Sequence, residues 1–180
     1  MTTSWFCSDL HIGHKNIEKF RHPLISSTEH NTSRIFDDWK HLVGKRDDVY
    51  VLGDVCFDID LLKEFENLSG SRKFLVRGNH DEFDTQVYLK YFDAVYGLKK
   101  YKEFWLSHAP MHPDELRGKV NLHGHVHFTS VRKPFNPVYD TKQELDSRYF
   151  NCCPENLWPT FGTSLVSLDT IRNYLANCNG

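Results

Sequence analysis

Five short clusters of metal-capable side chains are spread along the first two thirds of the chain. Each cluster follows a run of apolar or β-branched residues, and none contains cysteine: Asp9-Leu10-His11, Gly53-Asp54, Gly78-Asn79-His80-Asp81, Ser107-His108 and Gly124-His125-Val126-His127. Carboxylate, amide and imidazole ligands together describe a mixed oxygen and nitrogen site, which suits Mn²⁺, Fe, Zn²⁺ or Co²⁺. The residue types therefore predict a divalent metal site, provided that the fold brings the clusters together.

The elements that must position these clusters are predicted from hydrophobic periodicity. Residues 4–7 and 72–76 are short apolar runs bounded by turn formers, which is typical of buried strands, and residues 48–54 are expected to form a strand and the turn after it. Between them, residues 28–43 and 58–68 carry apolar side chains at helical spacing, and Asp58 or Asp60 is a possible N-cap. Strands alternating with helices indicate an α/β fold, in which ligand sites gather at the carboxyl ends of the strands.

The second half of the chain contains more strands. Residues 94–110 are predicted as short strands with a tight turn at Gly97, and residues 119–127 as a strand that ends in a histidine-rich loop. Residues 163–168 are a further strand, followed by a helix over 169–177. We interpret the intervening segment, 128–150, as an irregular or hairpin excursion. Parallel and antiparallel strands are therefore expected to be mixed.

Length and composition favour a single domain spanning residues 1–180. The chain is long enough to bury a core without disulfides, and no apolar run is long enough to span a bilayer. The net charge of −2 argues against a general affinity for nucleic acid. Five cysteines without C-x-x-C spacing argue against a disulfide framework. We expect a cytoplasmic protein without a membrane partner.

Each cluster alone is a weak signal, because a histidine at the end of a strand is more often structural than a ligand. Their order and completeness are more specific. The series D-x-H, G-D, G-N-H-D, S-H and G-H-x-H, from Asp9 to His127, resembles the calcineurin-like metallophosphoesterase superfamily, and the tail resembles its small bacterial and phage members. The resemblance implies an α/β four-layer α-β-β-α sandwich with two mixed β-sheets flanked by helices.

The resemblance also implies a dinuclear metal centre. A metal-bridging water or hydroxide would be the nucleophile, and Mn²⁺ is the metal most expected in an assay, with Fe, Zn²⁺, Co²⁺ or Ni²⁺ as alternatives. Transferred to this sequence, the ligands of the first ion would be Asp9, His11 and His127, those of the second Asn79, His108 and His125, and the bridge Asp54.

The same motif supplies candidate catalytic residues. His80 would be the general acid, and Asp81 would accept a hydrogen bond from the other ring nitrogen of His80 and orient it. Two weaker candidates for substrate binding are His14 and Arg77. For Arg77 a structural role is favoured over substrate contact, whereas for His14 the two interpretations have equal weight.

The predicted function is hydrolysis of a small phosphate ester. A phosphodiester or phosphomonoester fits the chemistry. A small nucleotide-like substrate is favoured because the chain contains no insertion that resembles a large capping domain. One alternative is a metal-dependent nuclease, which the net charge disfavours. The other is a non-catalytic metal-binding scaffold, which the complete ligand set disfavours. The sequence leaves the physiological substrate and the oligomeric state open.

Overall fold

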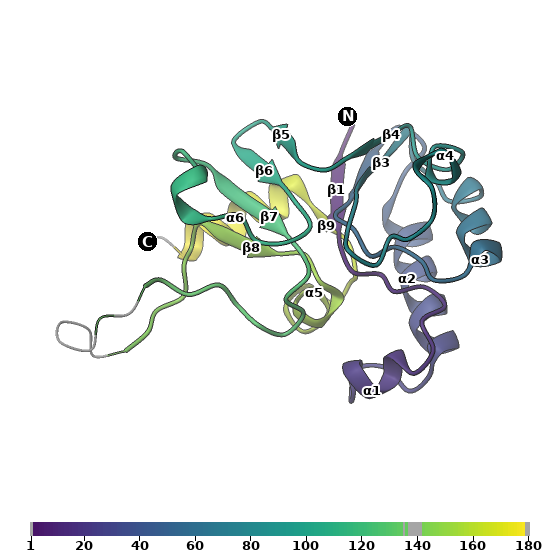
Figure 1. The fold of residues 1–180 in the computed structure, drawn as a ribbon, viewed down its shortest axis with the longest axis horizontal. Helices are drawn as coiled ribbons and strands as arrows, with labels where there is room; N and C mark the ends of the chain where they lie inside the picture. Colours follow the sequence, from purple (N-terminus) through teal and green to yellow (C-terminus); the bar gives the residue numbers. More distant parts are fainter. Residues whose placement is uncertain (1, 135, 137–141, 179–180) are drawn as a thin grey trace.

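Two β-sheets form the centre of the computed structural model, which describes residues 2–134, 136 and 142–178 (Figure 1). The first sheet has the order β4-β3-β2-β1-β9. Its parallel strands are β1 (Ser4–Cys7), β2 (Asp48–Val51), β3 (Arg72–Val76) and β4 (Ala94–Tyr96), and β9 (Val166–Ser167) pairs with β1 in the antiparallel sense. Because β1, β2 and β3 are parallel, the loops that follow them leave the same edge of the sheet.

The second sheet has the order β5-β6-β7-β8. It contains β5 (Lys99–Tyr101), β6 (Phe104–Leu106), β7 (Val120–His123) and β8 (Tyr149–Asn151), of which β5 is antiparallel and the other three are parallel. Both sheets are therefore mixed. The predicted class, an α/β sandwich of two mixed sheets flanked by helices, is confirmed.

Two of the helices begin where a short polar side chain satisfies free backbone amides. Ser27 accepts a hydrogen bond from the amide of His30 at the start of α2, and Asp58 caps α3 in the same way. The helical segments are α1 (Ile17–Arg21), α2 (Thr28–Leu42), α3 (Ile59–Lys63), η1 (Glu64–Glu66), α4 (Thr85–Tyr88), η2 (Pro113–Glu115), α5 (Pro154–Phe161) and α6 (Leu168–Cys178). Among the described residues, no helix combines the length and apolar composition needed to cross a membrane.

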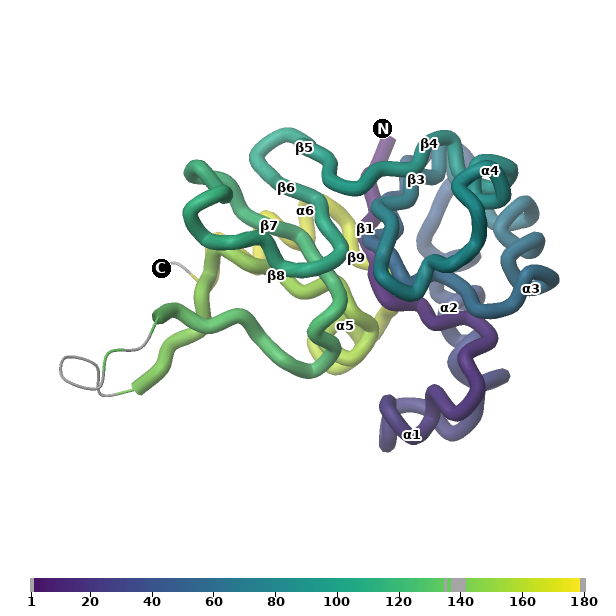
Figure 2. The backbone as a smooth tube through the Cα atoms, in the orientation of Figure 1, coloured from purple at the N-terminus to yellow at the C-terminus, as the bar shows by residue number. Residues whose placement is uncertain are grey.

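Strand alternation divides the core into two clusters, one on each face of the first sheet. Val49 and Val51 of β2 pack in the cluster that includes Trp39 of α2, whereas Tyr50 lies in the cluster that includes Leu122 of the second sheet. Figure 2 shows the same arrangement, with α2 and α3 on one side of the first sheet and β6 to β8 on the other. Burial of each large side chain contributes roughly 1.5–3 kcal/mol.

Two local predictions, a turn at Gly97 and a hairpin over residues 128–150, have different outcomes. The tight turn predicted at Gly97 is wrong, because Gly97 lies between β4 and β5, which belong to different sheets, and the chain crosses there instead of turning back. The hairpin interpretation of residues 128–150 is confirmed near its base, where Arg132 and Leu145 form an antiparallel bridge. Residues 135 and 137–141 of this segment lie outside the described residues.

Candidate metal centre

Asp54 lies at the middle of the site, in the loop that follows β2. Its Oδ2 is 3.7 Å from His11 Nε2 and 3.5 Å from His108 Nε2, and the residue is almost fully buried. Its Oδ1 accepts a hydrogen bond of 2.8 Å from the amide of His80. One carboxylate oxygen therefore faces two histidines from different loops, while the other is held by the backbone.

Asp9, His11 and His127 form the first group of potential ligands. Asp9 Oδ1 is 3.6 Å from His11 Nε2 and 3.7 Å from His127 Nε2. Both Asp9 Oδ1 and His11 Nε2 are buried without a hydrogen-bond partner. Separations of this size are expected between ligands whose bonds to one ion are roughly 2.0–2.2 Å long. The donor set therefore fits a divalent cation.

The other oxygen of Asp9 is fixed in place. Asp9 Oδ2 accepts hydrogen bonds from Ser8 Oγ at 2.5 Å and from the amide of His125 at 2.8 Å, and Cys153 Sγ lies 3.3 Å away. Because one oxygen is fully engaged, the other is directed toward His11 and His127. The carboxylate is thereby oriented before any ion binds.

Asn79, His108 and His125 form the second group. His108 Nδ1 lies 2.8 Å from the carbonyl of Leu52, which places the ring proton on Nδ1 and leaves a lone pair on Nε2. Asn79 Oδ1 is 2.8 Å and His125 Nδ1 is 3.2 Å from that Nε2. A carbonyl oxygen facing a lone pair is favourable when a cation binds both. The second group also fits a divalent ion.

The backbone at these positions is strained. Left-handed conformations are unfavourable for residues other than glycine and cost about 1–3 kcal/mol each, so they persist only where the surrounding structure holds them. Five of the seven predicted ligands adopt positive φ, namely Asp9 at 50°, His11 at 48°, Asp54 at 53°, His125 at 70° and His127 at 49°. Strain concentrated at one edge of the sheets supports a functional site there.

Glycines let the ligand loops touch one another. A Cβ atom on Gly124 would overlap Ser8 Oγ and Asp9 Oδ2, and one on Gly78 would overlap Asp54 Oδ1. The loop after β7 therefore approaches the loop after β1 more closely than any side chain at position 124 would permit. These contacts hold the two groups of ligands next to each other.

Electrostatics keeps two members of the first group, Asp9 and His11, in their metal-binding protonation states. Burial acts to raise the pKa of Asp9, but the His11 ring 3.6 Å away and the nearby His108 ring lower it well below its usual range. Burial lowers the pKa of His11, which favours the neutral imidazole. A carboxylate beside a neutral imidazole is the combination that binds a cation.

The similarity of this chain to known proteins agrees with a metal site at this position. Residues 2–162 match the family described as calcineurin-like phosphoesterase. The chain belongs to this family. The family implies divalent metal ions and phosphoester chemistry, and the chain contains groups of side chains that are able to hold such ions.

Curated relatives of this chain come from phages and an archaeon. The chain is 32% identical to the Gene 66 protein of Mycobacterium phage L5, over 71% of this chain and 78% of the relative. It is also 32% identical to the uncharacterized protein MJ1445 of Methanocaldococcus jannaschii, over 71% and 70% of the two chains. The crystal structure of AQ665 from Aquifex aeolicus, a protein of unknown function, superposes with a TM-score of 0.71 at 24% identity, covering 97% and 100% of the chains, and so supports the fold.

His80 lies at the open side of the candidate metal centre. The side chain is exposed, its ring lies 6.0 Å from that of His11, and its amide is anchored on Asp54. The sequence predicted that Asp81 would bond to the ring of His80. Both oxygens of Asp81 instead accept hydrogen bonds from backbone amides, those of Gly78, Asp54 and Val55. Asp81 therefore joins the loops after β2 and β3 and acts as a positioning residue.

The two weaker candidates differ in their surroundings. Arg77 donates to the carbonyls of Asp81 and Phe83, so its guanidinium braces the loop after β3, as the structural interpretation expects. His14 is half-buried, and its ring lies 5.6 Å from the ring of His11. His14 is therefore placed at the rim of the centre, where contact with a substrate is feasible.

Glu155 is the residue that motif reasoning missed. This buried side chain at the start of α5 has Oε1 2.8 Å from His127 Nδ1 and 2.7 Å from Arg21 Nε. Arg21 is fully buried and also donates to Asn31 Oδ1 at 2.6 Å. The only signal in the sequence was an acidic residue within the stretch 152–158, which is apolar apart from Glu155 and Asn156.

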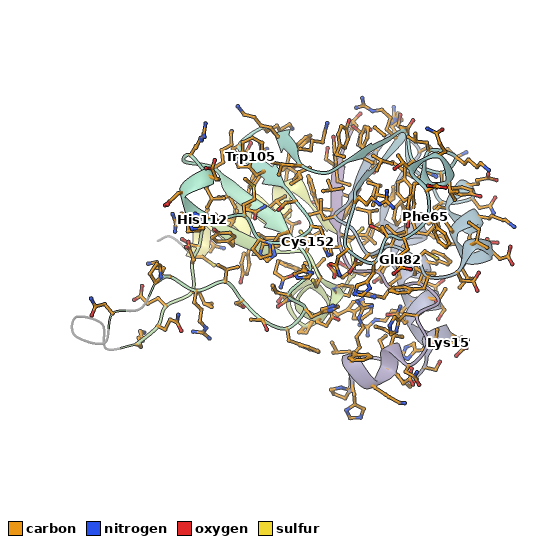
Figure 3. The ribbon with its side chains drawn as sticks, in the orientation of Figure 1. Lys15, Phe65, Glu82, Trp105, His112 and Cys152 are labelled. Atoms are coloured by element: carbon orange, nitrogen blue, oxygen red, sulfur yellow. The ribbon has the colours of Figure 1, made fainter. Side chains whose placement is uncertain are left out.

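Cys153 offers an alternative third ligand beside Asp9 and His127. Burial raises the pKa of its thiol well above the usual range, which disfavours the thiolate that would bind a metal. Cys152, the neighbouring residue, lies inside the molecule between the two sheets (Figure 3). The two adjacent cysteines are therefore better explained as packing residues.

Proposed function

We propose that this protein is a dinuclear metal-dependent phosphohydrolase that acts on a small phosphodiester or phosphomonoester, with nucleotide-like substrates favoured. The observation that carries the proposal is the position of Asp54 Oδ2, within 3.7 Å of His11 and 3.5 Å of His108, which belong to separate ligand groups. An oxygen in that position is suited to bridging two ions. Two ions held by these residues would polarise the phosphoryl group and supply an activated water.

The first ion would be held by Asp9, His11 and His127, and the second by Asn79, His108 and His125, with Asp54 shared. In each group, one histidine ligand is oriented by a hydrogen bond to the ring nitrogen that faces away from the metal position. The carbonyl of Leu52 holds His108, and Glu155 holds His127. Such preorganisation lowers the reorganisation needed when an ion or a phosphoryl group arrives.

His80 is the candidate general acid. Its amide bond to Asp54 Oδ1 ties the backbone of His80 to the proposed bridge, while its exposed ring reaches the side from which a substrate enters. From there Nδ1 or Nε2 is able to donate a proton to the leaving oxygen. Proton donation of this kind contributes roughly 10²–10⁴ in rate.

Two further parts of the proposal concern metal identity and location. The mixed nitrogen and oxygen donors favour Mn²⁺ in an assay, with Fe, Zn²⁺, Co²⁺ or Ni²⁺ as alternatives, over Mg²⁺, which prefers oxygen donors alone. A cytoplasmic location is supported by five cysteines that are all free thiols.

Metal-dependent hydrolysis is tested with purified protein and four kinds of substrate: a bis-aryl phosphate, a mono-aryl phosphate, nucleotides and cyclic nucleotides. Chelation should abolish hydrolysis, and Mn²⁺, Co²⁺ or Ni²⁺ should restore it better than Mg²⁺ does. Relative rates on the bis-aryl and mono-aryl phosphates decide between diester and monoester. Full activity in protein shown by elemental analysis to be free of metal would refute the proposal.

A further inference from the structure

Two exposed phenylalanines stand in a row of aromatic rings beside the metal centre. Phe57, in the loop between β2 and α3, is 37% exposed, and Phe20 on α1 is 65% exposed. Their rings are connected through His14, which lies 5.8 Å from Phe20 and 4.7 Å from Phe57. The row continues to His80, whose ring lies 5.6 Å from that of Phe57.

Phe57 makes little contribution to the core. It belongs to neither of the two buried hydrophobic clusters of the described residues, and the aromatic contacts of its ring are with His11, His14 and His80. A phenylalanine left open to water gives up the stabilisation that burial would provide. The core therefore gives no reason for an aromatic residue at position 57.

The position of Phe57 relative to the proposed chemistry does give a reason. Its ring stacks nearly parallel to that of His11, at an interplanar angle of 18° and a centroid distance of 5.4 Å, and it also approaches His80. A phosphoryl group at the metal centre would have its leaving oxygen toward His80. The group attached to that oxygen would then lie against the exposed part of Phe57.

Phe20 extends the same surface outward. Figures 1 and 2 show α1 standing away from the two sheets, on the side where the chain leaves β1 toward the metal centre. Exposed Lys15 and Lys19 flank this stretch, together with one acidic residue, Glu18. The surface is thus aromatic, with a small excess of positive charge at its margin.

We propose that Phe57 is a specificity-determining residue, on which a nucleobase or similar planar aromatic group of the substrate stacks next to His80. Phe20 extends this surface. Aromatic side chains bind bases of any sequence through their faces, so the surface selects a planar ring rather than a particular base. This inference rests on the proposed function, because it assumes that a phosphoryl group occupies the metal centre.

Binding of three probes to Mn²⁺-loaded protein tests the stacking. The probes are inorganic phosphate and the phosphonate analogues of ribose 5-phosphate and adenosine 5′-monophosphate, in which a methylene group in place of the ester oxygen prevents hydrolysis; the analogues keep the parent names below. All three carry a tetrahedral phosphorus group, and only the last carries a base. Titration calorimetry should find adenosine 5′-monophosphate bound about ten-fold more tightly than ribose 5-phosphate, which corresponds to about 1.4 kcal/mol. Phe57→Leu should remove most of this ten-fold difference, and Phe57→Trp should retain it.

A matched control is available on α6. Tyr174 is 40% exposed, close to the value for Phe57, but its ring contacts Phe150 and Phe161 instead of the site histidines. Tyr174→Leu should therefore leave the affinities of all three probes unchanged. Metal content, measured by elemental analysis, should stay at the wild-type level in both leucine variants.

The outcomes separate base stacking from support of His11. If Phe57 only supports His11, Phe57→Leu should lower the affinity for all three probes equally or reduce the metal content. Either result overturns the inference. Equal affinity of the wild-type protein for ribose 5-phosphate and adenosine 5′-monophosphate also overturns it, while phosphatase activity on aryl phosphates would leave the proposed function standing. Failure of the wild-type protein to hydrolyse any phosphoester refutes the proposed function itself.

A last arm distinguishes free nucleotides from nucleic acid as the source of the base. A single-stranded ten-nucleotide oligomer with methylphosphonate links and a terminal methylenephosphonate, which resists hydrolysis, is compared with the adenosine 5′-monophosphate analogue in the same titration. Equal affinity assigns the surface to a single nucleotide unit. Tighter binding of the oligomer that is lost in Phe20→Ala assigns it to a strand running over α1.

Discussion

Glu155 Oε1 lies 2.8 Å from His127 Nδ1, so a buried carboxylate on α5 holds the last histidine of the G-H-x-H motif. The hydrogen bond raises the pKa of His127 against the opposing effect of burial. It also places the ring proton on Nδ1, which leaves Nε2 free to face Asp9 Oδ1 at 3.7 Å. The orientation of one proposed ligand therefore depends on a residue outside every motif.

Glu155→Gln should weaken the affinity of the first metal position by roughly 10–100-fold, because a neutral amide orients and polarises His127 less well than a carboxylate. The second position should be nearly unaffected. Metal titration with counting of both ions checks the prediction. Glu82→Gln, on an exposed loop residue labelled in Figure 3, is the control and should bind both ions normally. Equal weakening of both positions would contradict the assignment.

Asp54→Asn should lower the occupancy of both metal positions and reduce turnover by several orders of magnitude, because the amide loses the charge shared between them. His108→Ala should affect mainly one position, with partial rescue by excess metal. Elemental analysis and steady-state rates on an aryl phosphate measure the difference. Two fully occupied positions in Asp54→Asn would show that Asp54 is not the bridge.

His80→Ala should keep both ions and the wild-type melting temperature while turnover falls by roughly 10²–10⁴. The loss should be larger for a substrate with a basic leaving group, because a nitrophenolate departs without a donated proton. Rates on two substrates that differ only in the leaving group, together with metal analysis, test this. An equal loss on both substrates would limit His80 to positioning.

Gly124→Ala should destabilise the protein by about 1–3 kcal/mol, because the new Cβ overlaps Ser8 Oγ and Asp9 Oδ2. The displacement of Asp9 should also weaken metal binding. Gly97→Ala is the matched control, since a Cβ there has nothing within 4 Å. Denaturant unfolding of the metal-free and metal-loaded proteins measures both effects. Similar stabilities of the two variants would contradict the close packing of the loops after β1 and β7.

His123 should make the protein less stable in mild acid. Burial lowers its pKa from 6.5 to about 4. Between these two pH values the unfolded state binds a proton at His123 and the folded state does not. The stabilisation is present above pH 6.5 and is lost as pH falls toward 4, at up to about 1.4 kcal/mol per pH unit. His123→Asn should flatten this part of the unfolding free-energy profile. An unfolding profile that keeps its full pH dependence in His123→Asn would contradict this assignment.

The sequence by itself determined the elements and the identity of the reactive groups. The strands at 4–7 and 72–76, a strand within residues 48–54 and the helix from residue 28 were predictable because hydrophobic period and capping are local properties. Asp58 as an N-cap was predictable for the same reason. The order of the five clusters was enough to identify the family, and residues 2–162 match it.

Only the tertiary structure decided which atoms meet. Motif order does not reveal that a single oxygen of Asp54 faces both ligand groups, or that Asp81 binds backbone amides instead of His80. It also does not reveal the contact between Glu155 and His127. These contacts depend on strand order, on the close approach of loops at glycines and on the packing of α5. A short-range pattern carries no information about such distances, because they are set by segments that are remote in the chain.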